Sequence, residues 1–317
     1  MSWLVVSGAA GVAYALMWRR LLPVLLLRCW FNITLGICVT AASVVSRLVT
    51  LLRYVGVTKP RTESLCRLLT PAIFRLHKWL NPHIHIHWLD GSVRWCDINP
   101  VGNATLLNHT SFMDTINYLW HVPMRYLQRA KTFNKASLLD MVIFGTLIRN
   151  TGMFPVYFVS DRSEEFRVEK DKQEAVNNEC HEFLKAGGSL TLFPEGRVSR
   201  NPRVINDLRF GSISLILEHR LTVYYILSCG NDDVWPYNSI GGYPANIVMY
   251  IGKYDADYAD PNITAKTLAE DLKAEMQRQL NHMFEVKDCL DRGEGERMRF
   301  LPFTSIVKKK PVNESSC

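Results

Sequence analysis

Negative charge is missing from the amino-terminal part of the chain, where no Asp or Glu occurs before Glu63. Residues 1–80 contain ten Lys or Arg, and because the whole chain of 317 residues has a net charge of +7, residues 81–317 sum to about −2. A nucleic-acid-binding protein would spread basic residues over a folded face together with aromatic stacking residues, and this chain does not. We therefore expect no nucleic-acid partner.

The eight cysteines lack the spacing of a covalent or metal framework. They form no close pairs and no Cys-x-x-Cys motif, so the sequence suggests neither a disulfide scaffold nor a zinc ribbon. The chain also has no serine or cysteine in a Gly-x-Ser-x-Gly turn. A covalent intermediate formed at such a nucleophile elbow is therefore not supported.

Charge of either sign is absent from two apolar stretches, residues 3–18 and 29–46, which are separated by three arginines and Pro23. Each stretch is close to the roughly 20 residues that a helix needs to cross a bilayer. The two stretches fit two short spans, one span, or a helical hairpin lying partly in one leaflet, and two buried core helices are the alternative. We expect residues 1–80 to form a hydrophobic, basic membrane-anchor region.

Basic residues follow the apolar stretches and predict a contact with anionic headgroups beside the anchor. They are Arg53, Lys59, Arg61, Arg67, Arg75 and Lys78. The alternative is the solvated face of an ordinary helix.

Residues 83–88 alternate strictly between histidine and an apolar residue, which predicts a strand with three imidazoles on one face. Three imidazoles could bind zinc. A polar outer face on a first strand gives the same pattern, and no nearby acid or cysteine completes a ligand set. We therefore expect no metal site.

The motif Asn108-His109-Thr110-Ser111-Phe112-Met113-Asp114 follows a short strand predicted over residues 104–107. Thr110 and Ser111 are both good N-cap residues, so we expect a helix to begin at one of them. Asp114 would then lie on the first helical turns and reach back to His109. A histidine oriented by an acid can accept a proton from a hydroxyl group. Alone, this spacing also arises by chance.

A second motif, Phe193-Pro194-Glu195-Gly196-Arg197, follows the alternating run at 189–192. The run predicts a strand, and Pro194 and Gly196 predict a turn at its end. Backbone amides, Glu195 and Arg197 would face a ligand there. Two such motifs at the ends of predicted strands are much less probable together by accident than either one alone.

Strands alternating with helices predict an α/β fold, with a mostly parallel central sheet flanked by helices. The expected helices cover residues 115–121, 167–185, 207–220 and 265–284, and further strands cover 125–127, 221–227 and 247–251, with a short hairpin at 94–97. We expect a catalytic domain over 81–286 and a polar tail over 287–317.

The two motifs resemble the first and third sequence blocks of the glycerolipid acyltransferases of the 1-acylglycerol-3-phosphate type, and the similarity runs from about residue 82 to about 284. The segments 208–211 and Gly230-Asn-Asp-Asp-Val-Trp-Pro236 resemble more narrowly the tafazzin-like branch, which consists of phospholipid transacylases. The resemblance implies that His109 is the base and that Asp114 orients its ring. It also implies that Glu195 and Gly196 position the glycerol backbone, while Arg197 holds a phosphate.

The resemblance adds Asn108, Ser111 and Lys135 to the substrate-binding residues, Lys135 as the lysine of the second block. The family usually has an arginine shortly after the strand of that block, where this chain has Tyr157 and Phe158. The next arginine is Arg162, so the phosphate contact falls to Arg162, Arg197 or Arg200, or is weaker than is usual in the family.

Membrane phospholipids and lysophospholipids are the implied substrates. The tafazzin-like branch implies a phospholipid donor, no required cofactor, cardiolipin remodelling and a mitochondrial membrane. The wider family implies acyl-CoA or acyl carrier protein as the donor, and the endoplasmic reticulum is the alternative location. A lipid-binding relative without activity and a hydrolase that transfers the acyl group to water are the rival functions.

Overall fold

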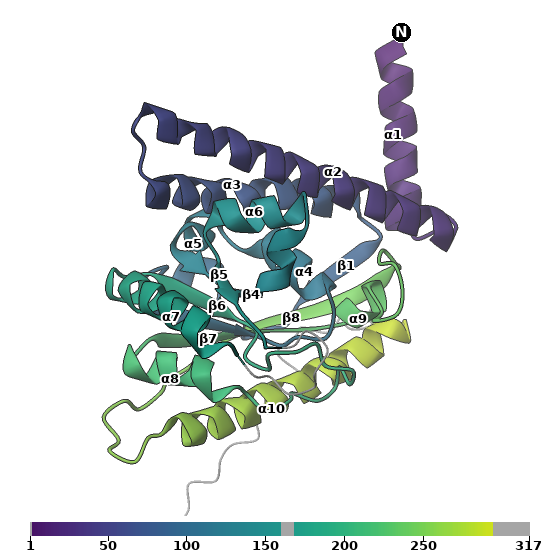
Figure 1. The fold of residues 1–317 in the computed structure, drawn as a ribbon. Helices are drawn as coiled ribbons and strands as arrows, with labels where there is room; N and C mark the ends of the chain where they lie inside the picture. Colours follow the sequence, from purple (N-terminus) through teal and green to yellow (C-terminus); the bar gives the residue numbers. More distant parts are fainter. Residues whose placement is uncertain (1, 160–167, 294–317) are drawn as a thin grey trace, which may run out of the picture.

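A computed structural model describes residues 2–159 and 168–293 of the chain, and Figure 1 shows its central sheet between layers of helices. The six-stranded sheet has the order β1-β8-β7-β2-β6-β3, and β4 and β5 form a separate pair. Every neighbouring pair is parallel except β7 and β8. The predicted mostly parallel sheet is therefore confirmed. The strands are β1 Ile84–Trp88, β2 Asn103–Leu107, β3 Ala130–Lys131, β4 Phe133–Lys135, β5 Phe154–Val156, β6 Ser189–Leu192, β7 Thr222–Cys229 and β8 Ala245–Tyr254.

Helices precede the sheet, connect its strands and close the chain. The α-helices are α1 Ser2–Trp18, α2 Val24–Thr50, α3 Lys59–Leu80, α4 Met113–His121, α5 Met124–Arg129, α6 Phe144–Thr151, α7 Lys170–Lys185, α8 Phe210–Glu218, α9 Asn231–Val234 and α10 Ala265–Asp291. Short 3-10 helices are η1 Leu51–Val55, η2 Trp95–Asp97 and η3 Ala136–Asp140.

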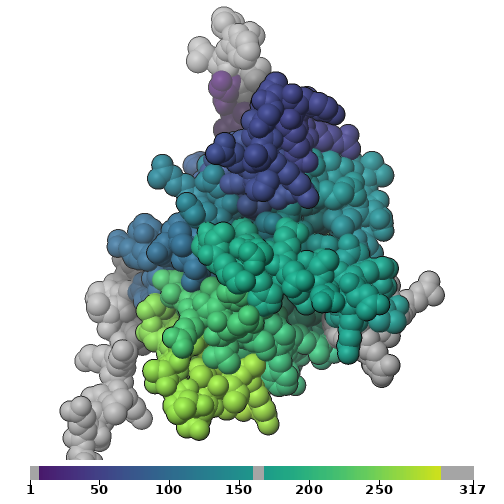
Figure 2. All heavy atoms as spheres, turned by 60° about the vertical axis from the view of Figure 1, so that its left-hand side comes forward, coloured from purple at the N-terminus to yellow at the C-terminus, as the bar shows by residue number. Residues whose placement is uncertain are grey.

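Alternation along β7 divides the core into two halves, one on each face of the sheet. Tyr225 and Leu227 belong to the half formed with α7, α8 and α10, whereas Tyr224 and Ile226 belong to the half formed with α2 to α6. Successive strand residues point to opposite faces, so one apolar strand supplies both halves. The result is three layers, with the amino-terminal helices at one end of the molecule and α10 toward the other (Figures 1 and 2).

The first two helices differ in how they meet the body. In Figure 1, α1 projects away from the other elements, whereas α2 lies along α3 and α6. One stripe of α2 is buried, and its members are Leu27, Phe31, Thr34, Cys38, Ala42, Ser43 and Ser46. In the described ranges, Val24–Val55 is the one helical segment that is long and apolar enough to cross a membrane by length and composition.

Several expected elements differ from the observed ones. Residues 125–127 belong to helix α5 rather than a strand, because Pro123 stands at the N-cap and its carbonyl accepts the first helical amides. The hairpin expected at 94–97 is the 3-10 turn η2. Helix α8 begins at Phe210 rather than at 207, since the amides of Asn206 and Arg209 donate to Glu195 and Pro194 instead.

The basic residues after the apolar stretches divide into two groups. Arg67 is buried and donates to the carbonyl oxygens of Gln128 and Thr151, so its predicted headgroup contact is wrong. Burial lowers the Arg67 pKa to about 10. Arg75 and Lys78 bond to Val122 and His121 at the end of α4, whereas the other three are exposed.

Candidate active site

His109 lies just beyond the carboxyl end of β2, with its ring held by the acid five residues later. The His109 Nδ1 atom is 2.9 Å from Asp114 Oδ2. The Asp114 side chain is 1% exposed and that of His109 is 18% exposed. Because an ionised carboxylate only accepts hydrogen bonds, Nδ1 donates and Nε2 keeps its lone pair. No described residue forms a hydrogen bond with Nε2, so His109 can serve as a base.

Asp114 also organises the backbone around the histidine. Its Oδ2 accepts the amides of Thr110 and Ser111 at 2.6 and 2.8 Å. Helix α4 begins at Met113 after Phe112. Of the two residues predicted to cap it, Ser111 does so through its hydroxyl oxygen, which accepts the Met113 amide at 3.1 Å. The amides of the loop turn inward to the carboxylate, which fixes the path of the chain on both sides of His109.

Asn231 completes the contacts of Asp114, and sequence reasoning did not identify it. Its Nδ2 donates to Asp114 Oδ1 at 2.6 Å and to Ser228 Oγ at 2.7 Å, and its Oδ1 accepts from Asn117 Nδ2 at 3.1 Å. Asn231 is fully buried in the short helix after β7. The sequence signal that could have identified Asn231 is the segment 230–236, which resembles the tafazzin-like branch.

Asp232 adds a second acid close to this network. Burial, followed by the charge of Asp233, raises the Asp232 pKa to about 6, although Lys287 opposes this shift. Lys287 pairs with Asp233 at 2.6 Å, and no partner is present within the described residues for the buried Oδ1 of Asp232. Asp232 is therefore a carboxyl group that changes charge near neutral pH beside the His109 loop.

Glu195 joins the two motifs, as the sheet topology requires. Strands β2 and β6 pair in parallel, so the residues after each lie at the same edge of the sheet. Glu195 Oε1 accepts the His109 amide at 2.9 Å, while Oε2 accepts the Asn206 amide and side chain at 3.0 and 2.7 Å. Burial raises the Glu195 pKa, and the hydrogen bonds from His109 and Asn206 oppose the shift.

These contacts change the role expected for Glu195. The carboxylate is 1% exposed and both oxygens accept hydrogen bonds from the protein, so it holds the His109 loop rather than offering a free acceptor to a ligand. Gly196 is exposed, with φ of +70°, and a Cβ there would lie 3.1 Å from Arg209 Cγ. Glycine is therefore needed for the turn itself.

A polar cavity of about 440 Å³ lies beside the Pro-Glu-Gly turn. Three basic side chains line it: Arg197, Arg209 and Lys273. Lys273 pairs with Asp207 at 2.7 Å, and Arg209 Nε donates to the Glu195 carbonyl at 3.3 Å. Arg197 is exposed at the rim. The cavity can hold an anion with several donors, and it shares Glu195 with the His109 loop.

The remaining residues predicted to bind substrate are Asn108, Ser111, Lys135 and Arg162. Asn108 is buried and exchanges two hydrogen bonds of 2.9 Å with the backbone of Ser228, and the Ser111 hydroxyl donates to the Trp235 carbonyl at 2.7 Å. Both side chains bond to the backbone of other segments, and we therefore assign them to holding these segments together rather than to substrate contact. Lys135 lies on β4 in the separate two-stranded sheet. Arg162 lies outside the described residues.

Aromatic side chains connect His109 to the amino-terminal helices. The ring of Phe193 lies 4.2 Å from that of His109, centre to centre. Phe112 is 58% exposed and lies 5.9 Å from Trp235, which in turn contacts Phe31 of α2 at 6.1 Å. Ring contacts therefore lead from the catalytic loop to the buried Phe31 of α2.

The histidine run at 83–87 does not form a metal-ligand group. Such groups were found in the described ranges only elsewhere, at His181, Glu218 and His219. His83 is fully buried before β1 begins, and the His85 ring bonds to the Trp18 carbonyl at 2.9 Å. The interpretation of this run as a polar outer face therefore does not hold for His83.

Comparison with known proteins places the site in a recognised fold. Residues 102–229, which include both motifs, match the family model described as Acyltransferase. The structure is similar to the crystal structure of the 1-acyl-sn-glycerophosphate (LPA) acyltransferase PlsC from Thermotoga maritima. The TM-score is 0.60 with 16% identity, over 82% of this chain and 95% of that chain. The predicted acyltransferase fold is thereby confirmed, and no curated protein matches the sequence at a significant level.

Proposed function

We propose that this protein transfers a fatty acyl chain to the free hydroxyl group of a lysophospholipid at a membrane surface. The observation that carries the proposal is the 2.9 Å contact between His109 Nδ1 and Asp114 Oδ2 at the carboxyl edge of the sheet. The match of residues 102–229 to the Acyltransferase family model supports the class of reaction.

The reaction follows from the free lone pair of His109 Nε2. As the acceptor hydroxyl oxygen bonds to the acyl carbonyl carbon, its proton passes to Nε2 and the carbonyl electron pair moves onto oxygen. Asp114 stabilises the imidazolium ion that forms. When the tetrahedral intermediate collapses, the bond to the donor breaks and the imidazolium returns the proton to the leaving oxygen or sulfur. No covalent acyl-enzyme is required.

The cavity beside the turn is the proposed site of the lipid phosphate. Arg197 lies exposed at its rim, and positive charge is added by Arg209, at the N-cap of α8, and by Lys273 of α10. A guanidinium group can bond two phosphate oxygens at once, which makes arginine well suited to this contact. Glu195 and Gly196 contribute by shaping the turn that carries Arg197.

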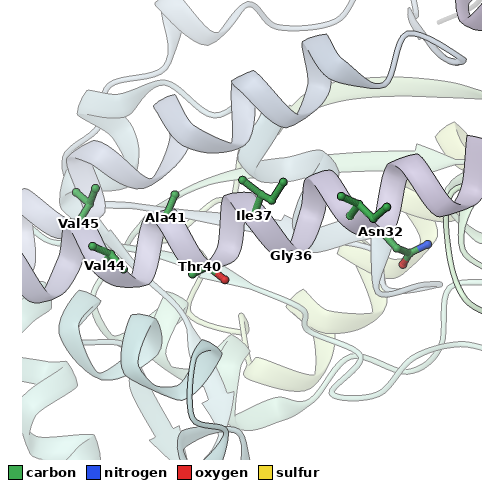
Figure 3. A pocket seen from close by; sticks show the side chains of 8 residues that line it. Asn32, Gly36, Ile37, Thr40, Ala41, Val44 and Val45 are labelled. Atoms are coloured by element: carbon green, nitrogen blue, oxygen red, sulfur yellow. The ribbon is translucent and has the colours of Figure 1, made fainter.

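Helix α2 is the proposed membrane contact. Its buried stripe packs on the body, while its other face exposes Leu25, Leu26, Ile33, Ile37, Val44 and Leu48. A shallow groove of about 670 Å³ runs along this face between Asn32 and Val45 (Figure 3). Because the opposite side of α2 is packed lengthwise on α3 and α6, we propose that the helix lies within one leaflet rather than crossing the bilayer.

The finer assignment is a tafazzin-like transacylase that remodels cardiolipin in a mitochondrial membrane without a cofactor. The segment 230–236 supports it, since this segment supplies Asn231 to the catalytic network and Trp235 to the contact with α2. The second candidate is an acyl-CoA-dependent lysophospholipid acyltransferase, for which the endoplasmic reticulum is the alternative location. The basic cavity is compatible with this candidate as well as with the first, because it suits any phosphate-bearing acceptor or donor.

Purified protein incubated with labelled phosphatidylcholine and lysocardiolipin, with and without acyl-CoA, tests these assignments. We expect labelled product without acyl-CoA. Product that requires acyl-CoA would support the ordinary transferase, and free fatty acid would identify a hydrolase. Lipid binding without turnover would identify a relative that has lost activity.

The matched variants are His109→Ala and His282→Ala, the latter on an exposed face of α10. We expect His109→Ala to lose transfer while its unfolding temperature and vesicle binding stay close to wild type. His282→Ala should retain full activity. Wild-type rates in His109→Ala would remove this histidine from the mechanism.

A further inference from the structure

Two helices on one side of the sheet bring two histidines and an acid together, away from the catalytic loop. His181 lies on the last turns of α7, while Glu218 and His219 stand at the end of α8. One ligand atom from each of the three residues lies within 4.8 Å of the others. His181 Nδ1 is 2.8 Å from His219 Nε2 and 3.4 Å from Glu218 Oε1.

This cluster lies at the opposite edge of the sheet from His109. Helix α7 ends just before β6 begins, and α8 ends just before β7 begins. Both strands run parallel to β2, so the cluster lies near the amino ends of the strands, whereas His109 lies beyond the carboxyl end of β2. The three residues therefore take no part in the proposed transfer reaction.

The distances suit a tetrahedral cation. With metal–nitrogen bonds of about 2.0–2.1 Å, ligand nitrogens on a tetrahedral ion lie about 3.3 Å apart. The observed 2.8 and 3.4 Å bracket that value, so a small outward turn of one ring would admit the ion. The side chains of His181 and Glu218 are 27% and 62% exposed, so neither is fully enclosed by other residues.

Zinc binds the neutral form of an imidazole ring, through the lone pair of the ligating nitrogen. The ammonium group of Lys185 is paired with Glu182 at 2.9 Å. In place of the direct contact between His181 Nδ1 and His219 Nε2, each of these nitrogens would bond to the same divalent ion.

We propose that His181, Glu218 and His219 form a zinc site that fastens the end of α7 to the end of α8. Two imidazoles and a carboxylate, with water in the fourth position, form a ligand set that zinc accepts. The ion would fix the two helices that lead into β6 and β7, and so stabilise the fold without taking part in catalysis.

The test is titration of the full-length protein, first freed of metal with a chelator, with zinc chloride. We expect one equivalent to bind, and a saturating zinc concentration to raise the unfolding temperature by about 3 °C. His181→Ala and His219→Ala should each lower the zinc affinity by at least about tenfold and remove the rise in unfolding temperature. Glu218→Gln, at the most exposed of the three positions, tests the site without disturbing the core.

His282→Ala is the matched control, because His282 lies 3.4 Å from Glu285 on α10 without a third ligand among the described residues. Its zinc affinity should equal that of the wild type. Substitution of cobalt for zinc should give a visible spectrum without thiolate bands. No zinc binding, thiolate bands, or equal affinity in wild type, His181→Ala and Glu218→Gln would each overturn the proposal.

Discussion

Asn231 offers a sharp test of how the catalytic histidine is positioned. Its amide reaches Asp114 Oδ1 at 2.6 Å, on the carboxylate that holds the His109 ring through the other oxygen. Replacing Asn231 by Ala removes this donor and leaves a buried carboxylate oxygen with only the longer contact of 3.4 Å from the Thr110 hydroxyl. Asp114 would then be held mainly through Oδ2, by the His109 ring and the Thr110 and Ser111 amides, so the orientation of the His109 ring would be less firmly fixed.

The size of the effect follows from the kind of hydrogen bond that is lost. A bond to a charged group contributes about 1.5–3 kcal/mol, which corresponds to a change of roughly 10- to 150-fold at 1.4 kcal/mol per factor of ten. Because Asn231 is buried and its amide bonds to other protein side chains, the loss should appear in kcat while KM for the lysophospholipid changes by less than about twofold.

The assay is the initial rate of transfer from a labelled acyl donor to a lysophospholipid, measured at several substrate concentrations. Asn117→Ala is the matched control, since it removes the 3.1 Å bond to the other end of the Asn231 amide but leaves Asp114 its donor. Asn117→Ala should lose far less activity than Asn231→Ala at a similar loss of stability. Equal losses of kcat in the two variants would refute the positioning role.

Three further results are expected. Arg197→Ala should raise KM for the lysophospholipid by about tenfold with little change in kcat. Its control is Arg200→Ala, because the Arg200 guanidinium stacks over a tyrosine ring at 5.4 Å. An equal rise of KM in Arg200→Ala would move the phosphate contact to Arg200. In a flotation assay, Ile37→Asp should bind phospholipid vesicles at least about tenfold more weakly than the wild type, since a charge in the hydrocarbon costs about 2.5–3.5 kcal/mol. The control Val101→Asp, before β2, should bind normally. The Asp232 pKa rises to about 6 in the folded state from an ordinary 3.8. As the pH rises from 4 to 6.5, the free energy of unfolding of the wild type should therefore fall by up to about 3 kcal/mol relative to that of Asp232→Asn. Parallel denaturation profiles for the two proteins would contradict this.

The sequence predicted the parts of the site that depend on local geometry. A histidine directly after an apolar strand, with an acid on the next helical turn, has few conformations open to it, and His109 and Asp114 lie 2.9 Å apart as expected. The position of Glu195 at the same edge follows from the parallel pairing of β2 and β6, which the alternation of strands and helices indicated.

Contacts between distant segments were not predictable in this way. Asn231 reaches Asp114 across 117 residues, and no periodicity or spacing connects them. Glu195 was read as a ligand group because it follows a proline in a turn, but the Asn206 and His109 amides that occupy it come from other loops. The strand expected at 125–127 is wrong because a run as short as Arg125-Tyr126-Leu127 suits a strand and a short helix equally.

The contact between α2 and the loop after α9 makes the proposed anchor inseparable from the enzyme. Gly242 has φ of +98°, and a Cβ on it would lie 2.6 Å from Phe31 Cβ, so the loop and the helix touch backbone to backbone. Arg28 reinforces this junction with bonds of 2.9 Å to Ser239 and Ile240. Cleavage after α2 would remove Phe31 from its contact with Trp235, the residue whose ring contacts Phe112 and whose carbonyl accepts the Ser111 hydroxyl in the His109 loop. Solubilisation by truncation should therefore stop before residue 24, where α2 begins.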